Sequence, residues 1–223
     1  MTYSIAALDE KTGAFGLAVS SSSPAVAARC AHVRASVGAV GTQNITDPRL
    51  GPRGLDMMAS GASAKEAIEI LKATHEHIAF RQLIAIDGKG RTAAFSGANV
   101  LGKNAYALAQ GAVSAGNLLA GEHVPQAVLD GFAKATGPFP ERIVKAMRAG
   151  LDAGGEEGPL HSVGLLVVDK VSWPVVDLRV DWHDDPIGEL ERLWKVYEPQ
   201  MDAYVTRALN PSAAPSFGVP GDK

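Results

Sequence analysis

Strand-like and helix-like segments occur in blocks along this chain, and their order constrains the fold more than any other feature. Two apolar, strand-like runs open the sequence at 3–8 and 15–20, separated by a loop that ends in Gly13. Such a loop is typical of a β-hairpin in which glycine takes the left-handed conformation. A further apolar run, rich in glycine and β-branched residues, predicts a buried strand at 37–43.

The periodicity then becomes helical. A short helix is expected over 55–60, and Ser63 and Glu66 have the spacing of a capping box that begins a second helix. A second hairpin follows, with strands at 82–86 and 92–96 around an Asp-Gly-Lys-Gly turn. The remaining expected elements are one or two short strands over 106–114, helices over 124–135 and 140–151, strands over 161–168 and 175–180, and a long helix from Pro186.

The blocks therefore run strands, helices, strands, helices, strands, helix. A doubly wound parallel sheet needs strict alternation, so this order favours antiparallel sheets covered by helices. The sequence has no internal repeat and no interdomain linker, which predicts a single domain over 1–209. Residues 210–223 have a linker-like Pro, Ser, Gly and Ala composition. We expect this tail to pack on its own domain or on a neighbouring subunit, and with the apolar last helix it favours a homodimer.

Composition excludes several classes of function. A formal charge of −3 over 223 residues gives no electrostatic footprint for nucleic acid or an anionic membrane. No apolar run approaches the ~20 residues that span a bilayer. The N-terminus lacks the pattern of a signal peptide, and the single cysteine, Cys30, cannot form an internal disulfide. Both features favour a reducing cytoplasm.

Six short stretches occur in an order that characterises one protein family. They are Met1-Thr2-Tyr3-Ser4-Ile5, Gly41-Thr42-Gln43, Gly51-Pro52-Arg53-Gly54-Leu55, Arg81-Gln82-Leu83, Gly116-Asn117-Leu118-Leu119-Ala120-Gly121, and Asp177-Leu178-Arg179-Val180-Asp181 running into Asp184-Asp185-Pro186. With them the chain, apart from its tail, resembles the family catalogued as domain of unknown function 1028. The resemblance implies the Ntn (N-terminal nucleophile) hydrolase fold, an α+β, four-layer αββα sandwich of two antiparallel sheets. The chain departs from the family at Leu160-His161-Ser162, where a basic residue and Gln-Ser are expected.

The resemblance places Thr2 where Ntn hydrolases keep their nucleophile. In these enzymes the chain is cut so that a Ser, Thr or Cys becomes the first residue. Its free α-amine, with a pKa of about 8, accepts the proton of its own side chain. Threonine is small enough for easy removal of Met1, which would expose Thr2 without a propeptide. Alternatively, Thr2 is an ordinary strand residue, because β-branched side chains favour strands. A chain that keeps Met1 could not use the N-terminal mechanism.

Acyl transfer also needs hydrogen-bond donors for the developing oxyanion. Gln43 and Asn117 are the best amides for this role, because both lie beside small residues that let a substrate approach the backbone. Each amide could instead satisfy the polar groups of its own loop. Ser20 is the hydroxyl most suited to orienting the amine of Thr2, although the four serines at 20–23 also fit an ordinary polar loop.

Three further residues are candidates for substrate binding. Arg179 and Asp181 alternate along one strand and so face the same side. Arg179 could clamp a substrate carboxylate in bidentate fashion, or it could pair with Asp181 and fix the sheet edge. Arg53 is an alternative anchor for an anion, as is Arg81, unless both are ordinary surface arginines.

No cofactor or metal is predicted. Residues 181–185 (Asp-Trp-His-Asp-Asp) and 75–77 (His-Glu-His) hold possible ligands, but neither group has a recognised metal-site spacing. Asp184 or Asp185 is better explained as the cap of the helix that begins at Pro186. The glycines form neither a P-loop nor a dinucleotide fingerprint.

Two functions from different classes follow, both with a small molecule as partner. One is an Ntn-type amidohydrolase that cleaves a small amide or a modified amino acid. In it Thr2 is the nucleophile, Gln43 or Asn117 serves the oxyanion, and Arg179 binds a carboxylate. The alternative is a binding or regulatory protein that uses the same sandwich without acyl transfer. A metal-dependent hydrolase using Asp181 and His183 is a third, weaker hypothesis.

Overall fold

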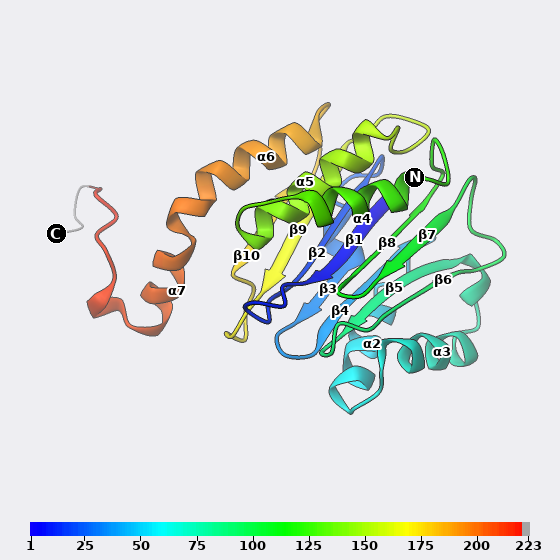
Figure 1. Ribbon diagram of the computed structural model, residues 1–223, viewed down its shortest axis with the longest axis horizontal. Coiled ribbons are helices and arrows are strands. Elements are labelled where there is room, and N and C mark those ends of the chain that lie inside the picture. Colours follow the sequence, from blue (N-terminus) through cyan, green and yellow to red (C-terminus); the bar gives the residue numbers. More distant parts are fainter. Residues whose placement is uncertain (220–223) are drawn as a thin grey trace.

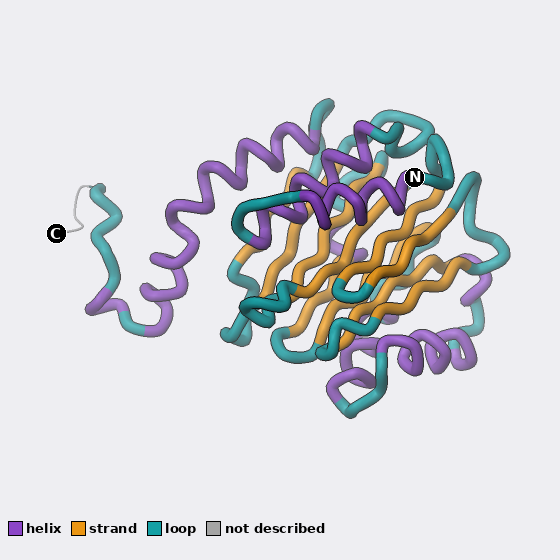
Figure 2. The backbone as a smooth tube through the Cα atoms, viewed as in Figure 1, coloured by secondary structure: helices purple, strands orange, loops and turns teal. Residues whose placement is uncertain are grey.

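The computed structural model describes residues 1–219. Two antiparallel sheets stack face to face, and helices cover both outer faces (Figures 1 and 2). The predicted α+β, four-layer αββα sandwich is therefore confirmed. The layers run from helices α4 and α5 through the larger sheet and the smaller sheet to helices α2 and α3.

The larger sheet has the strand order β10-β9-β2-β1-β8-β7, so that β1 is central. Its strands are β1 (Thr2–Leu8), β2 (Phe15–Ser21), β7 (Ala105–Ala109), β8 (Ala112–Asn117), β9 (Ser162–Val168) and β10 (Val176–Val180). The smaller sheet has the order β3-β4-β5-β6, with β3 (Ala31–Arg34), β4 (Gly38–Asn44), β5 (Arg81–Asp87) and β6 (Thr92–Ser96).

The helices are α1 (Ala27–Cys30), α2 (Leu50–Ala59), α3 (Ala64–Thr74), α4 (Val124–Lys134), α5 (Phe139–Asp152), α6 (Pro186–Tyr197) and α7 (Met201–Leu209). Short 3-10 turns lie at Ile78–Phe80, Glu198–Gln200 and Pro211–Ala213. The predicted capping box at α3 is confirmed, because the Ser63 hydroxyl accepts from the amide of Glu66 and the Glu66 side chain accepts from the amide of Ser63. The predicted cap of α6 is confirmed at Asp185, which accepts from the amide of Gly188 at 3.0 Å.

Three apolar cores fill the spaces between the four layers. Strand β1 contributes to two of them, because successive side chains point to opposite faces of a sheet. Tyr3, Ile5 and Ala7 pack toward the helices that cover the larger sheet, whereas Ala6 packs between the sheets. Thr2 and Ser4 share the face of Ala6. The first residue of β1 therefore points into the space between the two sheets.

One predicted helix begins earlier than expected, and one observed strand was not expected. Helix α2 begins at Leu50, before the predicted residue 55. Its glycines look like helix breakers in the sequence, but they lie inside the helix and let it approach the smaller sheet closely. A Cβ on Gly51 would overlap the ring of His32, and a Cβ on Gly54 would lie 3.1 Å from Val40. Strand β3, short and half-buried, lacks a clear apolar pattern and was not predicted.

The predicted long last helix is broken by the turn at 198–200 and continues as α7, which leads away from the sandwich (Figure 1). Every residue of α7 is at least partly exposed. The beginning of the tail folds back on α7, where the Arg207 guanidinium lies 3.5 Å from the ring centre of Phe217. Residues 220–223 of the predicted tail lie outside the described residues.

Candidate functional site

Thr2 begins the central strand of the larger sheet and is bordered on both sides. In the antiparallel register it pairs with Ser21 of β2 and with Asn117 of β8. All three side chains point into the space between the sheets, because residues in register share a face. Thr2 is 6% exposed. The prediction that the end of the second strand lies beside the start of the first is confirmed.

Two hydroxyl groups converge on the carbonyl that precedes Thr2. Thr2 Oγ1 lies 2.5 Å from the carbonyl oxygen of Met1, and Ser21 Oγ donates to the same oxygen at 2.6 Å. The two hydroxyls are 3.3 Å apart, and Ser23 Oγ lies 3.1 Å from Ser21 Oγ. At the start of β1 the carbonyl oxygen of Met1 thus accepts hydrogen bonds from two hydroxyl groups.

The structure places Ser21, and not Ser20, beside Thr2. Ser20 is one residue away along β2 and points to the opposite face, where its hydroxyl donates to the carbonyl of Tyr3 at 3.4 Å. Tyr3 in turn donates to the carbonyl of Met147 on α5 at 2.8 Å. Burial raises the pKa of the Tyr3 phenol well above its usual range. Ser20 therefore lies in a layer separated from Thr2 by the sheet itself.

The two predicted amides lie in one buried network whose centre is Gln82 of β5. Gln43 Nε2 donates to Gln82 Oε1 at 2.8 Å, and Asn117 Nδ2 donates to the same oxygen at 3.1 Å. Gln43 also donates to the carbonyl of Ala115 at 3.2 Å and accepts from Ser4 at 2.7 Å. Both N–H groups of Gln43 are thereby engaged within the protein. Gln82 was not predicted as a site residue, although it lies in the Arg-Gln-Leu stretch that marks the family.

The backbone turns sharply after both predicted amides. Asn44 follows Gln43 with a φ of 72°, and Leu118 follows Asn117 with a φ of 50°. Asparagine tolerates this region, but leucine does so at a cost of ~1–3 kcal/mol. Strain of this kind persists where the surroundings fix the backbone, and the Leu118 amide donates to the carbonyl of Leu101 at 3.0 Å. The turn at Leu118 holds Asn117 at the end of β8, next to Thr2.

A buried carboxyl group that sequence reasoning missed, Glu156, completes this end of the sheet. It lies in the loop between α5 and β9, which two glycines with positive φ, Gly154 and Gly155, turn back toward β8. A backbone bridge joins Glu156 to Leu119. The residue is 6% exposed and its Oε2 accepts from the amide of Ser22 at 3.2 Å. No pattern in the sequence marks this residue, because only the loop path brings it near Thr2.

Glu156 carries an unsatisfied group and a perturbed pKa. Within residues 1–219, its buried Oε1 has no hydrogen-bond partner. Burial raises its pKa to about 8, against smaller opposing effects of the N-terminal α-ammonium and the hydrogen bond from Ser22. A buried acid with a shifted pKa beside a candidate nucleophile is typical of a functional site.

The predicted anion anchors lie away from Thr2. Arg179 is on the edge strand β10, three strand spacings or ~14 Å from β1. It pairs with Asp177 at 3.2 Å, so the alternative in which it pairs with Asp181 is not observed. Asp181 follows β10 and its backbone carbonyl accepts from the amide of Ala25 at 3.0 Å. Arg81 is buried in β5 and donates to the carbonyl of Ile45.

Arg53 lies on α2, on the outer side of the smaller sheet. It donates to the hydroxyl of Thr74 at 3.1 Å beside a cavity of about 280 Å³. Asp47 and His75, 2.9 Å apart, line the same cavity. Hydrogen bonds from Arg49 hold the pKa of Asp47 well below its usual range. This group is separate from the site at Thr2, because the smaller sheet lies between them.

The stretch Leu160-His161-Ser162, where the sequence is expected to depart from the family that it resembles, lies next to the site. The His161 amide donates to the carbonyl of Ser21 at 2.9 Å, and its imidazole stacks on Trp182 with ring centres 4.2 Å apart. The His183 amide donates to the carbonyl of His161 at 2.8 Å. Among residues 1–219, no group of three His, Cys, Asp or Glu side chains could hold a metal ion.

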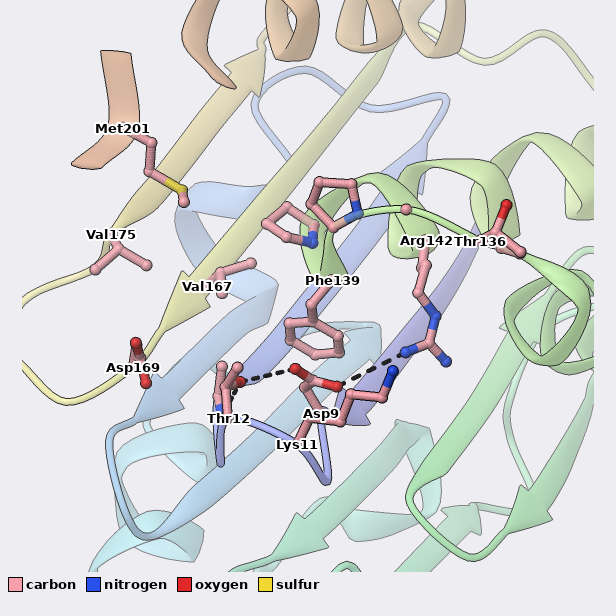
Figure 3. A pocket seen from close by; sticks show the side chains of 15 residues that line it. Asp9, Lys11, Thr12, Thr136, Phe139, Arg142, Val167, Asp169, Val175 and Met201 are labelled. Carbon is pink, nitrogen blue, oxygen red and sulfur yellow. Dashed lines mark hydrogen bonds and ion pairs between the residues drawn. The ribbon is translucent and has the colours of Figure 1, made fainter. Parts of the chain in front are cut away.

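A larger cavity of about 640 Å³ opens at the other end of β1, roughly 20 Å from Thr2 along the strand. Figure 3 shows its two sides. Asp9 forms the polar side with Thr12, which donates to it at 2.8 Å, and with Arg142 at 3.7 Å. The apolar side consists of Phe139, Val167, Val175 and Met201. The helices of the described chain include none long and apolar enough to cross a membrane.

Comparisons with known proteins place these features in a family. The sequence matches a family of unknown function (DUF1028) over residues 2–190. The crystal structure of a Silicibacter pomeroyi protein of that family superposes on this chain with a TM-score of 0.82. The match covers 88% of each chain, and the two sequences are 29% identical. HslV from Trypanosoma brucei is 13% identical over 75% of this chain and 99% of its own, with a TM-score of 0.46. A Gly-1 mutant of Anbu from Hyphomicrobium is 10% identical over 92% and 99%, with a TM-score of 0.41. No curated protein matches the sequence.

Proposed function

Because this chain belongs to the family of unknown function DUF1028, we propose a function for it from its own site: an Ntn-type amidohydrolase with Thr2 as nucleophile after removal of Met1. One observation carries this proposal. The hydroxyls of Thr2 and Ser21 both lie within hydrogen-bond distance of one acyl carbonyl oxygen, at 2.5 and 2.6 Å. Two hydroxyl donors at one carbonyl oxygen resemble the donors that an oxyanion needs, and Thr2 Oγ1 is the hydroxyl that would act as nucleophile on a substrate carbonyl carbon once Met1 is removed.

The chemistry uses groups at the end of β1. In the chain that begins at Thr2, Oγ1 attacks the amide carbon of the substrate and its proton passes to the α-amine of the same residue. The C–N bond then breaks, and the leaving nitrogen takes that proton. Water hydrolyses the resulting ester and restores the Thr2 hydroxyl. Ser21 Oγ and the second N–H of Asn117 are the donors that we assign to the oxyanion.

Gln43 and Gln82 have a different role in this proposal. Since both N–H groups of Gln43 are engaged, it does not face the substrate but holds Gln82 in place. Gln82 in turn accepts from Asn117 and fixes the orientation of that amide. Arg179 would contact only a substrate long enough to reach the edge of the sheet, and we propose it as a contact for the distant carboxylate of such a substrate.

The mass of the cellular protein and its turnover of amides test the proposal. We expect a mature chain that begins at Thr2 and that hydrolyses a small amide. The matched control is the same protein with Met1 retained, which should be folded and inactive. A native protein that keeps Met1, or equal turnover by both forms, would overturn the proposal.

A second candidate function, binding of a small molecule without turnover, is supported by the cavity at Asp9. Its volume of about 640 Å³ is in the range of ligand pockets, and its apolar wall faces charged groups. A thermal-shift screen with small amides and amino acids separates the two functions. A ligand that raises the unfolding temperature of the Met1-bearing protein without being hydrolysed supports binding. If the same ligand no longer raises the unfolding temperature of Arg142→Ala, the binding site lies at the cavity.

A homodimer and a cytoplasmic location complete the proposal. Exposed apolar side chains lie along α6, α7 and the tail, namely Val196, Tyr204, Leu209 and Phe217. Such a series is typical of an interaction surface. Solution scattering of the full chain should give twice the mass of one chain, and deletion of 198–223 should return it to a monomer. The single cysteine, Cys30, is buried and reduced, which is consistent with the cytoplasm.

A further inference from the structure

Met1 is held at the site through its side chain and its carbonyl. Its thioether lies against the bare backbone of Gly158, where an added Cβ would meet Met1 Cε at 2.7 Å and Sδ at 3.1 Å. Its carbonyl oxygen is held by the hydroxyls of Ser21 and Thr2. Met1 is therefore bound as an aminoacyl group is bound, with separate contacts for the acyl oxygen and for the side chain.

The third part of an aminoacyl group, its α-amine, lies near Glu156. Glu156 is two residues from Gly158, and its Oε2 is fixed by the amide of Ser22, the neighbour of Ser21. Its Oε1 is buried and has no hydrogen-bond partner among residues 1–219. The α-ammonium of Met1 is near enough to lower the pKa of this carboxyl group, but no hydrogen bond or ion pair joins the two among residues 1–219. The acyl oxygen and the side chain of Met1 thus have direct contacts, and the Glu156 Oε1 is left available for an ammonium that reaches it.

We propose that the space occupied by Met1 is the acyl subsite of the enzyme, and that its substrates are amides of α-amino acids with a free α-amine and an unbranched apolar side chain. This inference rests on the proposed hydrolase function and names its substrate class. The backbone nitrogen and Oγ1 belong to the same residue, Thr2. An aminoacyl group on Oγ1 is therefore an isomer of Met1 on the nitrogen, and it falls in the same space.

The reaction balances with groups already at the site. Thr2 Oγ1 bonds to the carbonyl carbon of the amino acid amide, and the Oγ1 proton moves to the Thr2 α-amine. The C–N bond breaks, the leaving amine takes that proton, and an aminoacyl ester remains on Oγ1. Water then cleaves the ester to release the free amino acid. Throughout, Glu156 holds the substrate ammonium, and Gly158 leaves room for its side chain.

Glu156 makes the subsite selective because a buried acid is costly to leave without a partner. A substrate ammonium supplies the missing donor to Oε1. An N-acetylated substrate has no charge at this point and adds atoms where the carboxyl group lies. Sites built to pair with a polar substrate group reject analogues that lack it.

The experiment uses protein that begins at Thr2 and two methionine anilides, one with a free α-amine and one N-acetylated. We expect kcat/KM for the free amine to exceed that for the acetylated anilide by at least ~100-fold. Glu156→Gln should reduce this ratio at least ~10-fold, mainly through KM, whereas Glu157→Gln should leave it unchanged. Glu157 is the matched control, because it is the next residue and its side chain is 58% exposed. Equal turnover of the two anilides would overturn the subsite while leaving the hydrolase intact.

Two further measurements keep the inference testable if Glu156→Gln does not fold or no anilide is cleaved. Gly158→Ala places a methyl group where the Met1 thioether lies, so it should shift the preference from methionine to alanine anilide. Calorimetry with methioninamide and N-acetylmethioninamide tests binding without turnover. Binding of the free amine alone supports the subsite even when the hydrolase proposal fails. Equal binding of both amides, or of neither, overturns the subsite.

Discussion

The two ends of the β1–β2 hairpin differ in how their polar groups are arranged. At the Asp9 end Arg142 lies 3.7 Å from Asp9 beside an open cavity of about 640 Å³, and the buried Nε of Arg142 has no partner among residues 1–219. At the Thr2 end hydroxyls, amides and a carboxyl group are all buried, and Glu156 Oε1 has no partner among residues 1–219. The Thr2 end is therefore distinguished by its larger set of buried hydroxyl and amide groups joined in one network, because burial of such groups is costly unless they are hydrogen-bonded.

The largest expected effect concerns the two threonines at opposite ends of the hairpin. In protein that begins at Thr2, Thr2→Ala should lower kcat/KM for an amide by at least ~10³-fold, because it removes the nucleophile. Thr2→Ser should retain activity. Thr12→Ala, at the cavity end, should leave kcat/KM unchanged. Steady-state kinetics on the three variants check this, and an active Thr2→Ala protein would remove the basis for assigning chemistry to this end.

The pH dependence of stability should come from the Thr2 end through Glu156. Burial raises the pKa of Glu156 from 4.5 to about 8, so between these values the folded protein binds more protons than the unfolded chain. The stabilisation is complete below pH 4.5 and is lost as the pH rises through 8. The full change in the free energy of unfolding amounts to ~5 kcal/mol.

Urea titrations of the Met1-bearing protein at pH 5, 7 and 9 measure this effect. Glu156→Gln should have a flatter pH profile than the unmodified protein and should be the more stable of the two at pH 9. Glu157→Gln, whose carboxyl group is exposed, should follow the unmodified protein. Parallel profiles for Glu156→Gln and the unmodified protein would show that this carboxyl group is ionised in the folded state at neutral pH.

A smaller effect compares a buried amide with an exposed one. Gln82→Ala should lower the free energy of unfolding by ~2–4 kcal/mol, because one buried N–H of Gln43 and one of Asn117 lose the oxygen that accepts from both. Gln110→Ala, at the cavity end, should cost less than ~0.5 kcal/mol because its amide is exposed. If urea denaturation gives equal losses of unfolding free energy for the two variants, the buried amide network contributes no more to stability than the exposed amide of Gln110.

The smallest effect is expected for the cation at the cavity. Arg142 lies 4.4 Å from the ring centre of Phe132 and 3.7 Å from Asp9, and both contacts are partly open to solvent. Arg142→Ala should therefore lower the free energy of unfolding by no more than ~1 kcal/mol. Thermal unfolding measures the change. A loss above ~3 kcal/mol, or ~6–12 °C in the unfolding temperature, would show that this end contributes as much to stability as the other.

The sequence predicts the layers of this fold well because most of its strands form hairpins with close neighbours. Its patterns also place Thr2 beside the end of the second strand. The error at Ser20 is a shift of one residue, which in a pleated strand turns a side chain to the other face. Ser21 therefore could not be chosen without the register of the hairpin.

The rest of the site comes from contacts between distant parts of the chain. Gln82 joins Gln43 and Asn117 across both sheets, and nothing in its local sequence indicates that role. Glu156 is placed by a loop that bridges to the end of β8. Long-range contacts of this kind leave no local periodicity, so neither residue could be predicted from sequence patterns.

The central position of β1 has a consequence for the order of events during synthesis. Thr2 is synthesised before its partner Asn117 and the nearby Glu156, which follow more than a hundred residues later. In the nascent chain the Met1–Thr2 bond is open to an aminopeptidase, but in the folded protein Thr2 is 6% exposed. The removal of Met1 that the proposed function requires is therefore expected before β8 pairs with β1. Rapid folding would then give a population that keeps Met1, and slow folding a population that has lost it.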